Sequence, residues 1–190
     1  GRTFKVIKET LEDLGYTVKS KVLNTMEYGN VPQNRERIFI VAFKDEEIAN
    51  RFKFPSKKKL SKKIHDFLET NVNNKYYYNG KALYANLKNE VTDNKYVYQW
   101  RRKYVRKNKS GVVPTLTANM GTGGHNVPII LDEKGIRKLT PKECFLFQGF
   151  PKTFKLPDLA DSKLYQQAGN SVSVTVIERI ARNIKKAMSK

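Results

Sequence analysis

Apolar residues recur at helical spacing near both ends of the chain. In the first fifteen residues they occur every three or four positions, at Phe4, Ile7, Leu11 and Leu14. This pattern predicts an amphipathic helix of about three turns, with Thr3 as its N-cap and Gly15 at its C-terminal end. A longer apolar stripe of the same spacing runs from Val172 to Met188 and predicts a second helix.

Between these helices the pattern changes to that of strands and turns. Residues 16–23 contain a strand signal, residues 28–32 form a turn signal, and residues 38–43 are an unbroken apolar run. Such a run is typical of a strand covered on both faces. Residues 140–143, Thr-Pro-Lys-Glu, combine an N-cap, a proline at the first helical position and a glutamate three residues later. They predict a short helix that ends near Gly149.

Residues 45–135 differ in character from the segments on either side. Lysines cluster at residues 57–63, a short candidate helix contains Ile64 and Phe67, and aromatic residues alternate with cations over residues 96–109. We interpret residues 45–135 as a separate, loop-rich basic module inserted between residues 1–44 and residues 136–190. Cations neutralise phosphates and aromatic rings stack on bases, so this composition suits a nucleic-acid-binding face.

The net charge of the chain also indicates a polyanionic partner. Its 190 residues carry 37 lysines and arginines against 18 acidic residues, a net charge of +19, and 39% of them are hydrophobic. The chain can therefore bury a core, and the excess charge requires a polyanionic partner. DNA or RNA fits better than an acidic protein or a membrane surface.

Several classes of protein are disfavoured. The apolar runs are far shorter than the roughly 18 to 20 residues that cross a bilayer, so we expect no membrane span. The N-terminus lacks both a methionine and a signal-peptide core, and there is one cysteine. We therefore expect a cytoplasmic chain, processed or cut from something longer. His65 and His125 lie apart from any cluster with metal-ligand spacing, so we expect no metal site.

Three short strings carry the most specific information. They are residues 32–37 (Pro-Gln-Asn-Arg-Glu-Arg), residues 137–151, which contain Arg-Lys-Leu-Thr-Pro-Lys-Glu and Gln-Gly-Phe-Pro, and residues 165–172 (Tyr-Gln-Gln-Ala-Gly-Asn-Ser-Val). In this order the strings resemble the C-terminal part of DNA cytosine-5 methyltransferases, and residues 114–118 resemble the Thr-Leu element of that family's target recognition domain. The resemblance implies an α/β fold: the C-terminal part of a Rossmann-like catalytic domain with an inserted loop-rich α+β recognition domain.

The resemblance implies the DNA-binding, target-recognising half of a restriction-modification enzyme. Such an enzyme transfers a methyl group from S-adenosylmethionine to C5 of a cytosine flipped out of double-stranded DNA. The family's Gly-rich cofactor loop, Pro-Cys nucleophile and Glu-Asn-Val element are absent from this sequence. We therefore expect the smaller subunit of a split bacterial enzyme or a piece of a whole one, inactive until an N-terminal half or partner subunit supplies Pro-Cys.

The first string implies the residues of the cytosine pocket. By resemblance, Arg37 donates to O2 of the target cytosine, where negative charge develops during catalysis. Arg35 is its neighbour on the active-site wall and helps to hold the catalytic loop or a phosphate. Alternate residues of a strand point to the same face, so Gln33 is expected on the same side.

The third string implies the cofactor contacts. By resemblance, Asn170, Ser171 and Val172 close over S-adenosylmethionine, and most of that pocket lies in the absent half. Gly169 is expected in a turn that approaches a ligand closely, followed by a helix start whose amides and Ser171 hydroxyl suit an anion.

Base-reading residues are expected on two loops of the insert, because forked donors such as arginine pair bidentately with guanine. The candidates are Arg101, Arg102 and Arg106 on the first loop and Thr115, Leu116, Thr117, Asn119 and Met120 on the second. Phosphate contact alone is the alternative for each arginine. Residues 98–102 and 115–120 are similar to relatives that recognise sites of the GG-x-CC type, and His125, beside the glycines of residues 121–124, is a further candidate contact.

Two motif residues are expected to be structural. Arg137 and Glu143 resemble the family pair that supports the recognition domain, and Cys144 lies outside the Pro-Cys context of the nucleophile, so we expect a buried thiol. Two other functions remain open: a stand-alone or degenerate DNA-binding module without catalysis, and a basic ribosomal or RNA-binding protein.

Overall fold

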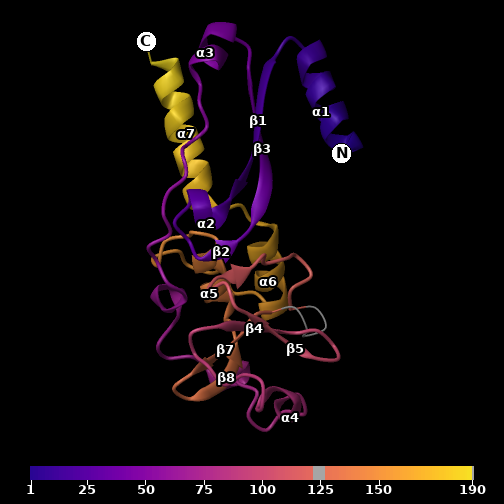
Figure 1. Ribbon diagram of the computed structural model, residues 1–190, viewed down its shortest axis with the longest axis vertical. Coiled ribbons are helices and arrows are strands. Elements are labelled where there is room, and N and C mark those ends of the chain that lie inside the picture. The colour runs from indigo at the N-terminus through magenta and orange to yellow at the C-terminus, as the bar shows by residue number, and fades with distance from the viewer. Residues whose placement is uncertain (122–126, 190) are drawn as a thin grey trace.

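One end of the molecule is built from the two ends of the chain. The computed structural model describes residues 1–121 and 127–189, and Figure 1 shows both termini at the same end of an elongated molecule. There α1 (Arg2–Asp13) leads into β1 (Thr17–Asn24), which pairs antiparallel with β3 (Glu36–Phe43). The helices α2 (Thr25–Tyr28), α3 (Glu46–Arg51) and α7 (Val174–Met188) complete this end.

The two predicted terminal helices are confirmed, with one correction at the first. α1 begins at Arg2, two residues before the expected start, so its N-cap is Gly1 and not Thr3. Gly15 follows the helix with φ +76, as a helix end requires. No residue of α1 is buried, whereas α7 buries Val176 and Ile180 against β1, β3 and α3.

The strand over residues 38–43 is confirmed, but the prediction that both of its faces are covered is wrong. β3 has β1 as its only strand partner among the described residues, and of its side chains only Phe43 is buried. Phe39, Val41 and Phe43 pack toward α3 and α7, whereas Ile38 on the opposite face is 46% exposed. A two-stranded sheet with helices on one side leaves its other side open.

Most of the inserted segment, residues 45–135, lies toward the opposite end of the molecule (Figure 1), but its first helix, α3, lies at the end with the termini. The largest sheet has the order β5-β4-β7-β8, and its last strand extends past residue 135 to Lys138. The strands are β4 (Val97–Trp100), β5 (Val105–Asn108), β7 (Ile129–Asp132) and β8 (Gly135–Lys138). Short helices lie within residues 64–87. They are 3₁₀ helices at Ile64–Phe67, as the sequence predicts, and at Asn74–Tyr76, followed by α4 (Tyr84–Leu87).

A central core joins the two ends. β2 (Gln33–Asn34) pairs in parallel with β6 (Val113–Pro114), and α5 (Pro141–Phe147) and α6 (Asp161–Asn170) lie beside them. The predicted capping box of α5 is confirmed, because Thr140 Oγ1 accepts from Glu143 N and Glu143 Oε2 accepts from Thr140 N. The largest hydrophobic cluster takes residues from all three sequence segments. Among them are Val31, Val113, Leu116, Phe147 and Tyr165.

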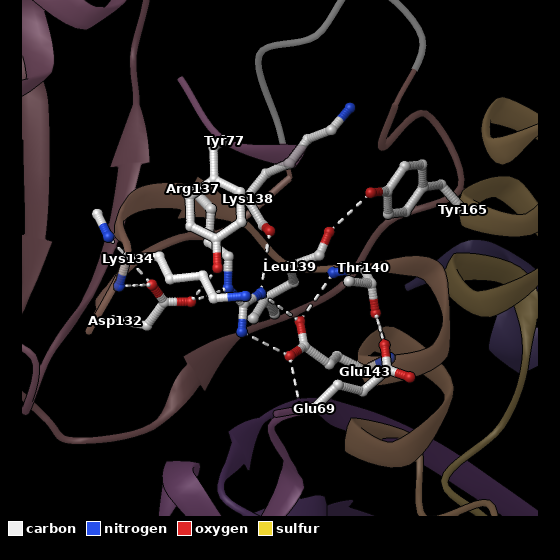
Figure 2. Close-up of polar contacts among 11 residues, drawn as sticks. Glu69, Tyr77, Asp132, Lys134, Arg137, Lys138, Leu139, Thr140, Glu143 and Tyr165 are labelled. Carbon is white, nitrogen blue, oxygen red and sulfur yellow. Dashed lines mark hydrogen bonds and ion pairs between the residues drawn. The ribbon is translucent and has the colours of Figure 1, made fainter. Parts of the chain in front are cut away.

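A buried ion pair fixes β8 to α5 (Figure 2). Arg137 is fully buried and donates through both terminal nitrogens to the carboxylate of Glu143, each at 2.8 Å. Its Nε pairs with Asp132 at 2.5 Å. Glu143 Oε1 also accepts from the backbone N–H of Glu69, which lies in the inserted segment. The structural pairing of Arg137 with Glu143 that the sequence suggested is therefore confirmed.

The electrostatics of this cluster favour the charged forms of Arg137 and Asp132. Burial disfavours the charged guanidinium, but hydrogen bonds and charge from Glu143 and Asp132 outweigh it and raise the pKa of Arg137 above its ordinary value. Burial also acts to raise the pKa of Asp132, yet the hydrogen bonds from Arg137 and Tyr77 lower it overall. Arg137 therefore remains charged in the folded protein.

Replacing Glu143 with glutamine leaves a buried guanidinium short of its main counter-charge. We expect Glu143→Gln to lower the free energy of unfolding by about 3 to 5 kcal/mol. Urea unfolding followed by circular dichroism measures this loss.

The matched control is Glu178→Gln on α7. Glu178 pairs with Arg182 through side chains that are 54% and 75% exposed, so its loss should cost less than about 1 kcal/mol. Equal losses of unfolding free energy in the two variants would show that burial does not make the Arg137–Glu143 pair more stabilising than an exposed pair.

Candidate functional site

A cleft of about 330 Å³ lies between β3 and the start of α7. It brings together residues from the first and third sequence strings, which are more than 130 positions apart in the chain. We call it the Arg37 cleft, and its lining includes Arg35, Arg37, Ile38, Ile40, Asn170, Ser171, Val172, Ser173 and Ile177. The candidate cytosine-contacting and cofactor-contacting residues therefore share one site, with Gln33 outside it.

Arg37 is the exposed one of the three residues predicted for the cytosine pocket. It lies near the start of β3, opposite Leu23 of β1, and its Nη1 donates to the carbonyl of Glu36 at 2.6 Å. The side chain lines the open cleft and reaches solvent. This position suits a guanidinium that meets a ligand entering from outside.

Arg35 is buried, and its two terminal nitrogens donate to main-chain carbonyls of the protein. Nη1 donates to the carbonyl of Leu116 at 2.8 Å, and Nη2 donates to the carbonyls of Ser171 at 2.9 Å and Gly169 at 3.2 Å. Burial, with a smaller effect of the Arg37 charge, lowers the pKa of Arg35 to about 10. The guanidinium is thus charged at neutral pH and holds main-chain carbonyls.

Gln33 is also buried and does not share a face with Arg37. Its Nε2 donates to the carbonyl of Phe147 at 2.6 Å and its Oε1 accepts from the N–H of Leu116 at 3.3 Å. The expectation of one continuous face fails because residues 33–37 are not one strand: β2 pairs with β6, whereas β3 pairs with β1. Gln33 and Arg35 tie elements together, and Arg37 alone of the three is exposed.

The loop over residues 169–173 differs from the expected turn and helix start. Gly169 lies within α6, and a Cβ there would come within 2.2 Å of the Thr117 carbonyl, so glycine is required for close approach and not for a turn. The helix that follows begins at Val174 with Ser173 as its N-cap, and the Ser171 hydroxyl donates to the carbonyl of Ala168. Ser171 is therefore the C-cap of α6 and not the N-cap of α7.

A second and larger cleft, of about 490 Å³, lies between the hairpin β4–β5 and the segment after β6. We call it the Arg106 cleft. Five of the eight candidate base-reading residues line it: Arg101, Arg106, Thr115, Thr117 and Asn119. Its remaining lining residues are Asn34, Gln99, Asn108 and Pro114.

Three lining residues with amide side chains were missed by the sequence reasoning. Gln99 forms a cross-strand pair with Arg106 and accepts from Arg101 Nη2 at 3.3 Å. The main-chain carbonyl of Asn34 accepts a hydrogen bond from Thr115 Oγ1 at 2.7 Å. Asn108 is the last residue of β5. Gln99 lies two residues before the candidate Arg101, and Asn108 lies two residues after the candidate Arg106. Alternate residues of a strand share a face, so this spacing would have indicated both.

The other candidate base-reading residues lie elsewhere. Leu116 and Met120 are buried in the central core, with 1% and 0% exposure, so these side chains support the cleft from behind and are not placed to touch a base. Arg102 is exposed in the turn between β4 and β5, where its φ is +64, and does not line the cleft. His125 and residues 122–124 lie outside the described residues.

Cys144 is fully buried on α5, as expected of a structural cysteine. Burial, followed by the charge of Glu143, raises the pKa of its thiol well above the ordinary value. Over residues 1–121 and 127–189, no helix is long and apolar enough to cross a membrane. The same residues contain no group of three histidine, cysteine or carboxylate side chains that could hold a metal ion.

Sequence comparisons identify similar proteins over nearly the whole chain. The profile of the C-5 cytosine-specific DNA methylase family matches residues 1–186. The chain is 55% identical over 192 aligned positions to the Type II methyltransferase M.Bsp6I of Bacillus sp. (strain RFL6), covering 99% of this chain and 61% of that protein. It is 38% identical to the Type II methyltransferase M.SsoII of Shigella sonnei, covering 97% and 48%. The chain thus spans less than two thirds of these relatives.

Solved structures agree on the fold. The Entamoeba histolytica methyltransferase EhMeth superposes with a TM-score of 0.71 at 19% identity, over 98% of this chain and 59% of that one. The S. pombe Dnmt2 methyltransferase gives a TM-score of 0.69 at 16% identity, over 100% and 64%. The expected α/β fold, part of a methyltransferase domain, is confirmed.

Proposed function

The chain belongs to the C-5 cytosine-specific DNA methylase family, and from that premise we propose that it is the target-recognising, cytosine-holding part of a restriction-modification methyltransferase. One observation carries the proposal: Arg37 and the segment Asn170–Val172, far apart in sequence, line one cleft. A module that only binds DNA has no need of this second cleft beside its reading surface.

The cationic surface binds the duplex. Lysines 57–63 and the basic residues of 101–109 are mostly exposed, and charges of this kind neutralise phosphates without reading sequence. The Arg106 cleft reads bases, because it presents two guanidinium groups beside four amide side chains and two threonine hydroxyls. Arginine pairs bidentately with guanine, and asparagine or glutamine pairs with adenine.

Arg37 holds the flipped cytosine. Chemistry at C5 requires the base to leave the helix and enter a pocket. A guanidinium at the pocket mouth donates hydrogen bonds to O2 of the cytosine and stabilises the negative charge that spreads over the ring as a nucleophile adds at C6. Cys144 is not that nucleophile, because it is buried and its pKa is raised.

The Arg37 cleft also fits one side of an S-adenosylmethionine site. Ile38, Ile40 and Val172 give it apolar walls, and the buried Ser173 Oγ and Arg35 Nε, in the described part of the chain, have no hydrogen-bond partner. The cofactor supplies the methyl group when bound. Asn170 and Ser173 provide polar groups on one side of the cofactor only. Most of the cofactor pocket would therefore be formed by an N-terminal portion.

That N-terminal portion is the proposed partner of an exposed apolar surface. Val22 and Ile38 on the sheet, and Val172 and Ile177 beside it, are 38% to 56% exposed, and α1 buries no residue. Apolar groups grouped in this way mark an interaction surface. We propose that the portion carrying the Gly-rich loop and the Pro-Cys nucleophile covers it, in the cytoplasm of a bacterium.

Reconstitution tests the proposal. The chain alone should bind duplex DNA and transfer no methyl group from labelled S-adenosylmethionine, and addition of the complementary N-terminal portion should restore transfer. Sequencing of methylated cytosines on plasmid DNA would then give the target. Methyl transfer by the chain alone would contradict the division of labour, and binding without transfer in the complete protein would favour a degenerate DNA-binding module.

Arg37→Ala separates the pocket from the DNA-binding surface. In the complete enzyme we expect methyl transfer to fall by at least about a hundredfold, as when a preorganised charge-stabilising donor is removed, with duplex affinity changed less than threefold. Rates from labelled cofactor and affinities from fluorescence anisotropy measure the two effects. Arg182→Ala, on the exposed face of α7, should change neither. Equal losses of binding and transfer would refute the pocket assignment.

Arg106→Ala tests base reading. Loss of a bidentate base contact should cost about 1 to 3 kcal/mol on the cognate duplex and relax the preference at one base pair. Competition binding with single-base variants of the site measures both. Arg102→Ala, on the same hairpin but outside the cleft, should weaken all duplexes alike and reduce their salt dependence. If Arg106→Ala weakened binding equally for every single-base variant of the site, Arg106 would contact only phosphates.

A further inference from the structure

The two clefts meet at a single buried side chain. Arg35 lines the Arg37 cleft, and its guanidinium spans two segments that are 53 positions apart in the chain. Nη1 binds the carbonyl of Leu116, between two residues that line the Arg106 cleft. Nη2 binds the carbonyls of Gly169 and Ser171, on either side of Asn170 in the Arg37 cleft. The same rigid group therefore holds the back of both clefts.

Direct contact reinforces this bridge. A Cβ on Gly169 would lie 2.2 Å from the carbonyl carbon and oxygen of Thr117 and 2.5 Å from the nitrogen of Ala118. The backbone of the DNA-reading segment thus lies against the last turn of α6. No side chain separates the two segments at this point.

A second hydrogen-bonded path runs parallel to the first. Gln33 Oε1 accepts from Leu116 N, and Gln33 Nε2 donates to Gln148 Oε1 at 3.3 Å. Gln148 Nε2 donates to the carbonyl of Ala168 at 2.7 Å. Gln33 and Gln148 are fully buried, so water cannot readily replace these bonds if one segment shifts. Displacement of Leu116 must therefore move residues 168–171 or break buried hydrogen bonds.

We infer that Arg35 is a positioning residue that couples recognition of the DNA target to the shape of the cofactor loop. This inference rests on the proposed function of the two clefts. A base bound by Thr115 and Thr117 fixes the position of the Leu116 carbonyl. Arg35 is hydrogen-bonded to that carbonyl and to the carbonyls of Gly169 and Ser171, so it fixes these as well. Asn170, which lies between them, is then held in position to contact the cofactor. Coupling of this kind is reciprocal, so bound cofactor tightens the DNA complex by the same factor.

The test measures a ratio of affinities in the complete enzyme. Fluorescence anisotropy gives the affinity for cognate and unrelated duplexes, with and without saturating S-adenosylhomocysteine, which binds in place of the cofactor without reacting. Couplings between sites are commonly about 5-fold to 150-fold. We therefore expect S-adenosylhomocysteine to raise the affinity for the cognate duplex at least about tenfold and the affinity for the unrelated duplex much less.

Arg35→Lys keeps the positive charge but cannot reach three carbonyls on two segments with the geometry of a guanidinium. We expect its coupling to fall below threefold, and the ratio of affinities, not the affinity for either ligand alone, is the readout. Arg182→Lys, the same replacement on the exposed face of α7, should keep the wild-type coupling. A variant that weakens both ligands and retains the coupling ratio would show a merely structural Arg35 and overturn the inference.

Wild-type protein provides a readout that does not depend on the variant folding. In hydrogen–deuterium exchange, cognate duplex without cofactor should slow exchange at residues 113–121 and also at residues 168–173. Protection confined to residues 113–121 would refute the coupling. Absence of DNA or cofactor binding in the complete enzyme would instead refute the proposed function, so the two failures are distinguishable.

Discussion

The buried pairing of Arg137 with Glu143 is the interaction on which the remaining structure depends. A guanidinium removed from water needs counter-charge and hydrogen-bond acceptors, and Glu143 meets that need only if β8 and α5 lie side by side. Once α5 is fixed, its end presents Phe147 and Gln148 to Gln33. The first sequence string is thereby anchored, and Arg35 and Arg37 follow in fixed positions.

Burial then decides what each arginine does. Arg137 and Arg35 are enclosed, and their terminal nitrogens donate to acceptors within the protein, so they act on the architecture of the site. Arg37 and Arg106 are exposed at the mouths of clefts, where a guanidinium can meet a ligand. The same side chain thus serves as a tie in one place and as a recognition group in another, and only its surroundings differ.

The net charge of +19 acquires a spatial meaning in the same way. Exposed cations cluster at residues 57–63 and 101–109 of the inserted segment. The sheet formed by β1 and β3 presents exposed apolar groups such as Val22 and Ile38. The cationic clusters suit a polyanion and the apolar surface suits a protein, in agreement with a chain that spans only part of the length of its relatives.

The sequence by itself determined the terminal helices, the capping box at Thr140, the buried Cys144 and the family. Periodicity, caps and motif strings are local, so a few neighbouring residues specify them. The tertiary structure alone decided that Gln33 and Arg35 are buried while Arg37 is not, that one face of β3 is open, and that α6 ends against Thr117. Each of these depends on partners from 12 to more than 130 positions away, and no local pattern records whether such a partner covers a side chain.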